Sequence, residues 1–116
     1  MKAEEFSGIA TSNPLDGSTG TSNTGTSASS GSVTPLGTHD LVIGFVAGHS
    51  NGQGMTVSDS SYAAQPQQTS SGGGSAVASI ITGYKVLSSA TAVSFSGSFS
   101  STMYWSANVA CFRAAS

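Results

Sequence analysis

The chain contains very little charge. Only 7% of its 116 residues are charged, and the three basic residues, Lys2, Lys85 and Arg113, are far apart. A typical soluble domain has about a quarter of its residues charged. Binding to nucleic-acid phosphates or to an anionic membrane surface needs clustered Lys and Arg. The composition therefore predicts no nucleic-acid partner and no attachment to an anionic membrane.

Cysteine and long apolar runs are also scarce. Cys111 is the single cysteine, so the chain has no internal disulfide and no cysteine-based metal site. Its apolar surroundings, "NVACFRA", indicate a small buried side chain rather than a nucleophile. No apolar run approaches the ~20 residues of a membrane-spanning helix, and the N-terminus lacks the apolar core of a signal peptide. We therefore predict no membrane insertion.

Localisation is indicated only by composition. A chain without a signal peptide is either cytoplasmic or a piece of a larger exported protein. Ser, Thr and Gly are abundant here and Lys is rare, which is typical of extracellular or cell-surface proteins. This favours an extracellular or cell-surface protein, of which the chain is a fragment or a processed form.

Helical periodicity is absent, whereas strand patterns recur along the chain. Residues 91–100, "TAVSFSGSFS", alternate so that Val93, Phe95 and Phe99 face a core and the serines face water. Residues 41–47, "LVIGFVA", predict a strand buried on both faces. About seven strands with Gly-rich turns predict one all-β domain over residues 1–116: an antiparallel, jelly-roll-like two-sheet sandwich.

The other segments are assigned by the same rules. The sequence predicts a short strand over 3–10, a low-complexity Ser/Thr/Gly loop over 17–26, and a strand near 26–34. It predicts a hairpin turn at "HSNGQG", a half-exposed strand from Met55, and an edge or irregular segment after Pro66. Residues 75–87 alternate between two faces, and a last strand spans 102–114.

Three stretches carry a resemblance to a known module: "EFSG" at 5–8 followed by "NPLD", "DLVIG" at 40–44, and the closing strand with Trp105, Ala110 and Arg113. They resemble the C-terminal part of a jelly-roll or concanavalin A-like β-sandwich module of large exported bacterial proteins. Cys111, between Ala110 and Phe112, departs from the pattern. The resemblance covers nearly the whole chain, and its motifs are structural rather than catalytic.

The resemblance implies that further strands precede the "EFSG" stretch in the complete module. A sandwich without its first strands exposes edges and half-covered apolar faces. A second copy, a strand-completing partner chain or strand exchange would cover them. We therefore expect a homo-oligomer or a filament; the alternative is that the 116 residues close compactly without help.

Catalytic and metal-binding patterns are weak. His39 and His49 flank a strand of about ten residues, roughly 30 Å apart at ~3.3 Å per residue, so one metal cannot join them within a chain. Glu4 and Glu5 are adjacent and face opposite sides of a strand, unlike a glycosidase pair. No serine lies in a G-x-S-x-G turn, and Lys85 with Asn108 is only a weak candidate for an isopeptide crosslink. We predict no enzyme activity, no metal and no cofactor.

Aromatic and amide side chains supply the remaining candidate site. Sugar-binding sandwiches combine an aromatic platform with planar amides, and the candidate ligand or interface residues are Trp105, Tyr104, Tyr62, Asn51 and Gln53. Core packing is the competing interpretation for Trp105, and plain loop connections for the amides. The sequence therefore predicts a non-enzymatic structural or adhesive module that self-associates; the alternative is a carbohydrate-binding module.

Overall fold

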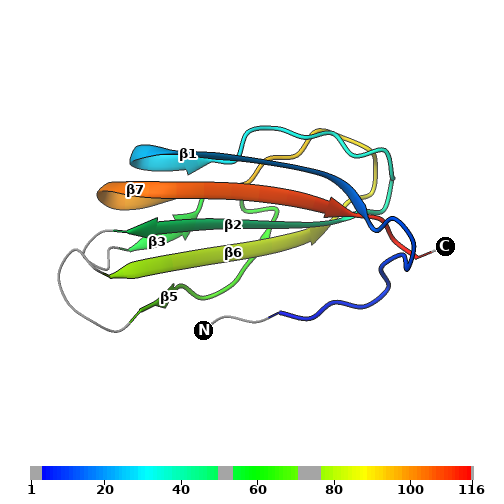
Figure 1. Ribbon diagram of the computed structural model, residues 1–116, viewed down its shortest axis with the longest axis horizontal. Helices are drawn as coiled ribbons and strands as arrows, with labels where there is room; N and C mark the ends of the chain where they lie inside the picture. The colour runs from blue at the N-terminus through cyan, green and yellow to red at the C-terminus, as the bar shows by residue number, and fades with distance from the viewer. Residues whose placement is uncertain (1–3, 50–53, 71–76, 116) are drawn as a thin grey trace.

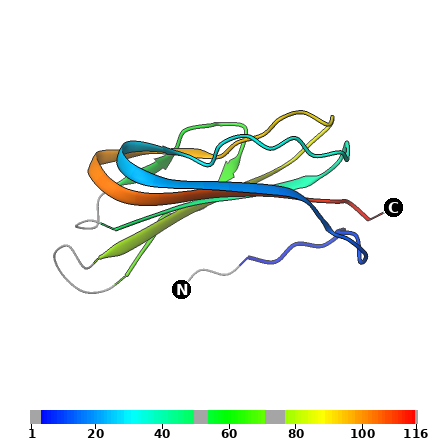
Figure 2. The same ribbon diagram turned by 45° about the horizontal axis from the view of Figure 1, so that its top comes forward.

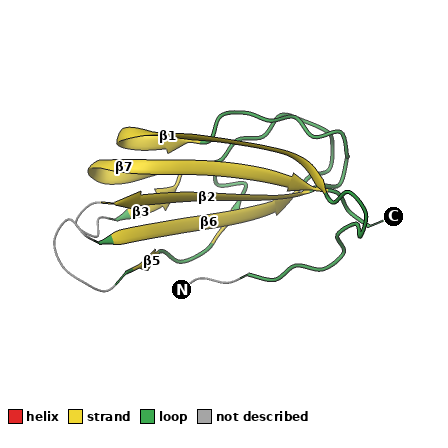
Figure 3. Ribbon diagram, viewed as in Figure 1, coloured by secondary structure: helices red, strands yellow, loops and turns green. Residues whose placement is uncertain are grey.

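The protein is an all-β structure (Figure 3). The computed structural model describes residues 4–49, 54–70 and 77–115, and among these residues no helix is long and apolar enough to cross a membrane. All strand pairs are antiparallel, in the order β1-β7-β2-β6-β4, with β3 paired to β7 and β5 to β6. The strands are β1 (Leu15–Ser29), β2 (Leu41–His49), β3 (Met55–Val57), β4 (Ala63–Ala64), β5 (Gln68–Thr69), β6 (Ala78–Val86) and β7 (Ser96–Phe112). The predicted fold class and strand number are confirmed.

The sheet curls over itself at one end. β1 and β7 bend together, because the register between them shifts between Gly25, opposite Met103, and Ser27, opposite Ser98. The last residues of β1, the first residues of β7 and β3 then lie as a short layer above the long strands (Figures 1 and 2). All seven strands belong to one sheet, which is compatible with a sandwich; a separate second sheet is not formed by the described residues.

The core lies inside this curl, and period-two alternation builds it. Odd-numbered residues of β7 and even-numbered residues of β2 face inward, so that Val42 pairs with Cys111 and Val46 with Ala107. As predicted, Val93, Phe95 and Phe99 are buried. Burial of these side chains removes apolar surface from water, which is the main driving force of folding. The largest fully buried apolar side chains are Phe95, Met103, Val42, Val46 and Val109.

The ring of Phe95 occupies space that glycines leave free. A Cβ atom on Gly44 would overlap the Phe95 ring, and one on Gly83 would lie 3.0 Å from it. The edge of the Tyr62 ring meets Phe95 at a centroid distance of 4.9 Å, and the Phe95 amide donates a hydrogen bond of 2.9 Å to the Ser30 hydroxyl. The glycines in β2 and β6 therefore let an aromatic side chain lie directly on the sheet backbone.

Two sequence predictions are wrong at the N-terminal end. The low-complexity residues 17–26 form most of β1 rather than a loop, because the ladder to β7 pairs their backbone and Thr suits the pleat. Residues 4–10 form no strand; they make one isolated bridge, between Ile9 and Ala114.

The predicted strands over 91–100 and 102–114 are one continuous strand from Ser96. The predicted turn at "HSNGQG" lies largely outside the described residues.

We expect Gly44→Ala to destabilise the fold by about 1–3 kcal/mol, because the new methyl group overlaps the Phe95 ring and overpacks the core. Urea unfolding followed by circular dichroism measures the change. Gly54→Ala is the matched control, since a Cβ there has no neighbour within 4 Å. Equal unfolding midpoints for the two variants would contradict the packing described here.

Candidate functional site

The sheet has a second face, opposite the core. Strand register fixes which side chains share it: Ile43, Phe45 and Ala47 of β2 lie between two neighbouring strands. Their β6 partners are Tyr84, Thr82 and Ile80, and their β7 partners are Ala110, Asn108 and Ser106. We call this surface the outer face; its other members are Leu15, Ser18, Gly20, Ser22 and Thr24 of β1, with Leu41, His49, Ala78, Val86, Tyr104 and Phe112.

The N-terminal segment, residues 4–10, covers part of the outer face. Phe6 packs edge-on against Tyr84 with ring centroids 5.1 Å apart. The Thr82 hydroxyl donates a hydrogen bond of 2.8 Å to the Glu4 carboxylate. Figure 2 shows this segment crossing on the side of the sheet away from the curled layer. The segment therefore covers part of β6 but does not extend as far as β1.

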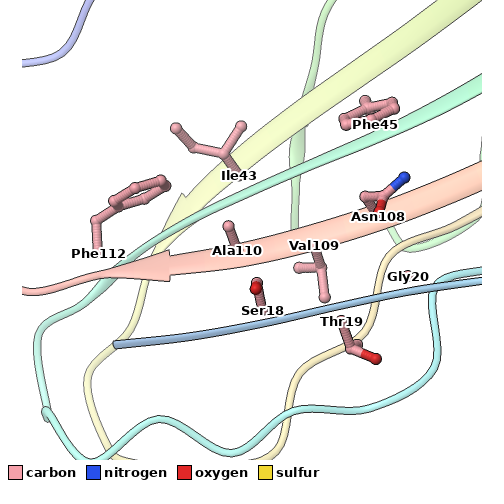
Figure 4. Close-up of a pocket in the computed structure, with 9 residues that line it drawn as sticks. All are labelled: Ser18, Thr19, Gly20, Ile43, Phe45, Asn108, Val109, Ala110 and Phe112. Atoms are coloured by element: carbon pink, nitrogen blue, oxygen red, sulfur yellow. The ribbon is translucent and has the colours of Figure 1, made fainter. Parts of the chain in front are cut away.

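The uncovered part of the outer face is a shallow apolar groove. It has a volume of about 480 Å³, and Phe45 remains 36% exposed within it. Ile43, Phe45 and Phe112 project into the same space from β2 and β7 (Figure 4). The lining residues, which define the outer groove, are Ser18, Thr19, Gly20, Ile43, Phe45, Asn108, Val109, Ala110 and Phe112.

The chemistry that the outer groove offers is burial of apolar surface. Its lining includes no carboxylate, imidazole, thiol or amine that could act as a general acid or base. Its polar side chains on the outer face are Ser18 and Asn108, because the Thr19 side chain points to the inner side of β1. Asn108 extends over Gly20, where a Cβ atom would overlap the side-chain amide. The groove therefore offers mainly apolar surface that another molecule could cover.

The three sequence-predicted site residues within the described part of the chain, Tyr62, Tyr104 and Trp105, do not come together. Tyr62 is 5% exposed and belongs to the core, where its hydroxyl donates a hydrogen bond of 2.8 Å to the Ser94 carbonyl. Burial raises the pKa of Tyr62 to about 12. It is therefore no aromatic platform, and that prediction is wrong.

The remaining candidates separate as well. Trp105 is partly buried and packs on the core, whereas its neighbour Tyr104 is 68% exposed on the outer face. Successive side chains of a strand point to opposite faces, so the two aromatics cannot form one platform. Asn51 and Gln53 lie outside the described residues.

Sequence reasoning missed a buried charged cluster at the end of the sheet where β2 begins and β7 ends. Asp16 and Arg113 form an ion pair of 2.8 Å between Oδ1 and Nη2, and the Asp16 side chain is 0% exposed. The amides of Leu36 and Gly37 donate to Asp16 Oδ2 at 3.0 and 2.9 Å. The carboxyl group of Asp40, a residue that is 1% exposed, lies beside that of Asp16.

The two carboxyl groups of this cluster have opposite pKa shifts. Backbone hydrogen bonds from Gly37, together with Arg113, hold the pKa of Asp16 below its usual value. Burial raises the pKa of Asp40 to about 6, and the neighbouring Asp16 carboxylate adds to the rise. A carboxyl pair in contact holds a shared proton more easily than two negative charges. The carboxyl pair is therefore a buried structural contact whose net charge depends on pH.

Other candidate groups stay apart. His39 precedes β2 and His49 ends it, and no group of three or more His, Cys, Asp or Glu side chains that could hold a metal occurs among the described residues. Lys85 contacts Ser61 at 3.0 Å and Asp59 at 4.0 Å. Asn108 lies on the opposite face of the sheet, so an isopeptide bond between Lys85 and Asn108 is excluded by geometry.

Comparison with known proteins adds no relative. No family model, no curated protein and no solved structure matches the chain.

We expect the folded state to lose stability as pH rises from about 4 to 7. The pKa of Asp40 is about 6 in the folded protein and 3.8 as a reference for the unfolded chain. The folded state therefore binds more protons in this window, and acidification stabilises it. Below that window the lowered pKa of Asp16 acts in the opposite direction. Thermal unfolding at steps of pH measures the effect.

Asp40→Asn tests the assignment. An amide cannot titrate, so the dependence on pH between 4 and 7 should flatten in this variant. Asp59→Asn is the control, because hydrogen bonds from Ser61 lower the pKa of Asp59 and its removal leaves the Asp40 effect intact. An Asp40→Asn variant with the wild-type slope would refute the assignment.

Proposed function

We propose that this protein is a non-enzymatic structural or adhesive module that associates with copies of itself through the outer face. The observation that carries the proposal is the outer groove, an apolar hollow of about 480 Å³ left open between the N-terminal segment and β1. When a second layer covers apolar surface of this kind on one side of a sheet, the free energy of the system falls. A second copy supplies that layer.

The charge distribution supports a second copy as the occupant. Contact between two identical faces across a two-fold axis pairs members of the same face: residues near the axis meet their own copies, and the others meet a different residue of that face. No Lys, Arg, Asp or Glu of the described strands points onto the outer face, so like charges are not forced together there. Glu4, at the margin, already accepts a hydrogen bond from Thr82.

The size of the outer face also fits self-association. The nine residues of β2 at ~3.3 Å each, across the three uncovered strands β1, β7 and β2 at ~4.8 Å, give roughly 430 Å². Two such faces bury about 860 Å² together, which is in the range of weak, transient interfaces. We therefore expect a weak, reversible dimer through this contact.

The buried carboxyl pair supports a structural rather than an enzymatic function. Asp16 is held by Arg113 and by two backbone amides, and Asp40 is 1% exposed. A substrate has no access to carboxyl groups placed in this way. We further propose an extracellular or cell-surface location, which the low Lys content and the Ser- and Thr-rich composition support.

We expect Phe45→Lys to weaken self-association at least tenfold, because it places two like charges inside the contact and removes its central aromatic side chain. Sedimentation velocity over a range of concentrations measures the dissociation constant. Leu36→Lys is the matched control, since Leu36 is 82% exposed and is not a member of the outer face.

A wild-type protein that stays monomeric at high micromolar concentration would contradict the proposal. So would equal association of the Phe45 and Leu36 variants. Circular dichroism and urea unfolding establish that both variants are folded.

A carbohydrate-binding function is the second candidate, and one observation favours it. Tyr104 is 68% exposed beside a hollow of about 330 Å³. An aromatic ring of this kind offers a flat apolar face on which a sugar ring can stack. The residues around the hollow include His49 and Ser106, which supply polar groups.

Binding to a glycan array would distinguish the two functions. If the protein binds sugar, Tyr104→Ala should reduce the signal at least tenfold while Val86→Ala, at an equally exposed position of the outer face, leaves it unchanged. The absence of any specific glycan signal for the folded wild type would exclude this second function.

A further inference from the structure

Strand β1 lies at one edge of the sheet and is long for such a position. It has 15 residues, and β7 is its only strand neighbour within the described part of the chain. An edge strand presents a row of backbone N–H and C=O groups that another strand can pair with. Protein edges are usually protected by charged side chains, Pro, short length or a covering segment.

Charged side chains and Pro are missing from most of β1, and residues 30–37 lie against its inner side. Residues 17–29 contain neither Pro nor a charged side chain. The one charge in the strand, Asp16, is fully buried against Arg113. The opposite edge is different, because β4 and β5 have two residues each and Pro66 lies between them. The free backbone is therefore concentrated on the β1 side.

We propose that β1 pairs antiparallel with β1 of a second copy, so that the sheet continues from one molecule into the next. Two identical antiparallel strands are related by a two-fold axis, so one self-complementary edge is sufficient. The regular part of β1, between the register shifts after Leu15 and after Gly25, is uncharged and meets no like-charge repulsion.

The outer groove favours a second copy over an unrelated strand. Ser18 and Gly20 of β1 form the groove wall nearest this edge. Pairing of two β1 strands joins the grooves of two copies into one continuous apolar surface. The edge contact is thus adjacent to the face contact and enlarges it.

This inference rests on the proposed function and extends it. The outer face supplies one two-fold contact and β1 supplies a different one. A molecule with a single two-fold contact stops at a dimer, whereas two different two-fold contacts let copies add further, to a closed tetramer where the two axes intersect and to an open chain where they do not. The structure therefore predicts assembly beyond a dimer, in which face and edge contacts alternate.

Four proteins separate the two contacts by sedimentation velocity and light scattering. Wild type should grow beyond a dimer as its concentration rises. Asn23→Lys places a charge on the exposed edge, with its side chain on the opposite side from the outer face, and should stop at a face-paired dimer. Phe45→Lys should stop at an edge-paired dimer, and the double variant should be monomeric. Asn23→Gln is the matched control and should grow like wild type.

The pattern of outcomes decides each contact. A wild type that stops at a dimer, with Phe45→Lys monomeric and Asn23→Lys unaffected, overturns the edge contact and leaves the proposed function intact. A wild type that stops at a dimer, with Asn23→Lys monomeric and Phe45→Lys still dimeric, overturns the face contact and leaves the edge contact.

Spin labels test the antiparallel geometry directly. Single labels at the exposed residues Ser18, Ser22 and Thr24, in the Phe45→Lys background, should give distances between copies that change by about 6–7 Å per residue moved, twice the ~3.3 Å strand rise. Cys111 is 0% exposed and is not expected to take the label. Equal distances at the three sites, or no measurable distance in a dimer, would overturn the proposal.

Discussion

Strand β7 is the element on which the rest of the structure depends, because it pairs with β1, β2 and β3. Its side chains keep one alternation from Ser96 to Phe112 in spite of the bend. Inward residues such as Met103 and Val109 build the core, whereas outward residues such as Ala110 and Phe112 form the outer groove. One strand pattern therefore determines both the stable interior and the exposed apolar surface.

The charged cluster ties together three segments that the sheet brings to one end. Asp16 begins β1, Asp40 precedes β2, and Arg113 follows β7. Arg113 also donates hydrogen bonds to the carbonyl groups of Asn13 and Leu15, at 2.7 and 3.0 Å. Burying two carboxyl groups beside one guanidinium is costly unless hydrogen bonds satisfy them. The backbone amides of Leu36 and Gly37 contribute such bonds to Asp16 and fix the chain between β1 and β2.

Local alternation was readable from the sequence, whereas pairing over long distances was not. The inward positions Phe95 and Phe99 follow from period two alone. The Ser/Thr/Gly run of β1 fits a solvated loop and an edge strand equally well, and only its ladder to β7 decides between them. Asp16 and Asp40 are 24 positions apart, so a reading along the chain gave no sign of their contact. The burial of Tyr62 likewise depends on Phe95 and Ser94, from a distant segment.

The low charge of the chain bears both on the partners that its composition argues against and on the proposed assembly. The scarcity of Lys and Arg, from which the composition predicts no nucleic-acid partner, also leaves the β1 edge and the outer face without repulsive groups. A net charge of −2 gives only weak repulsion between copies. Specificity must then come from geometry: strand register at the edge, and the shape around Phe45 and Phe112 on the face. In the proposed assembly, the face contact and the edge contact are both two-fold, and both include residues of β1. The surface around β1 would therefore determine the order in which copies can add.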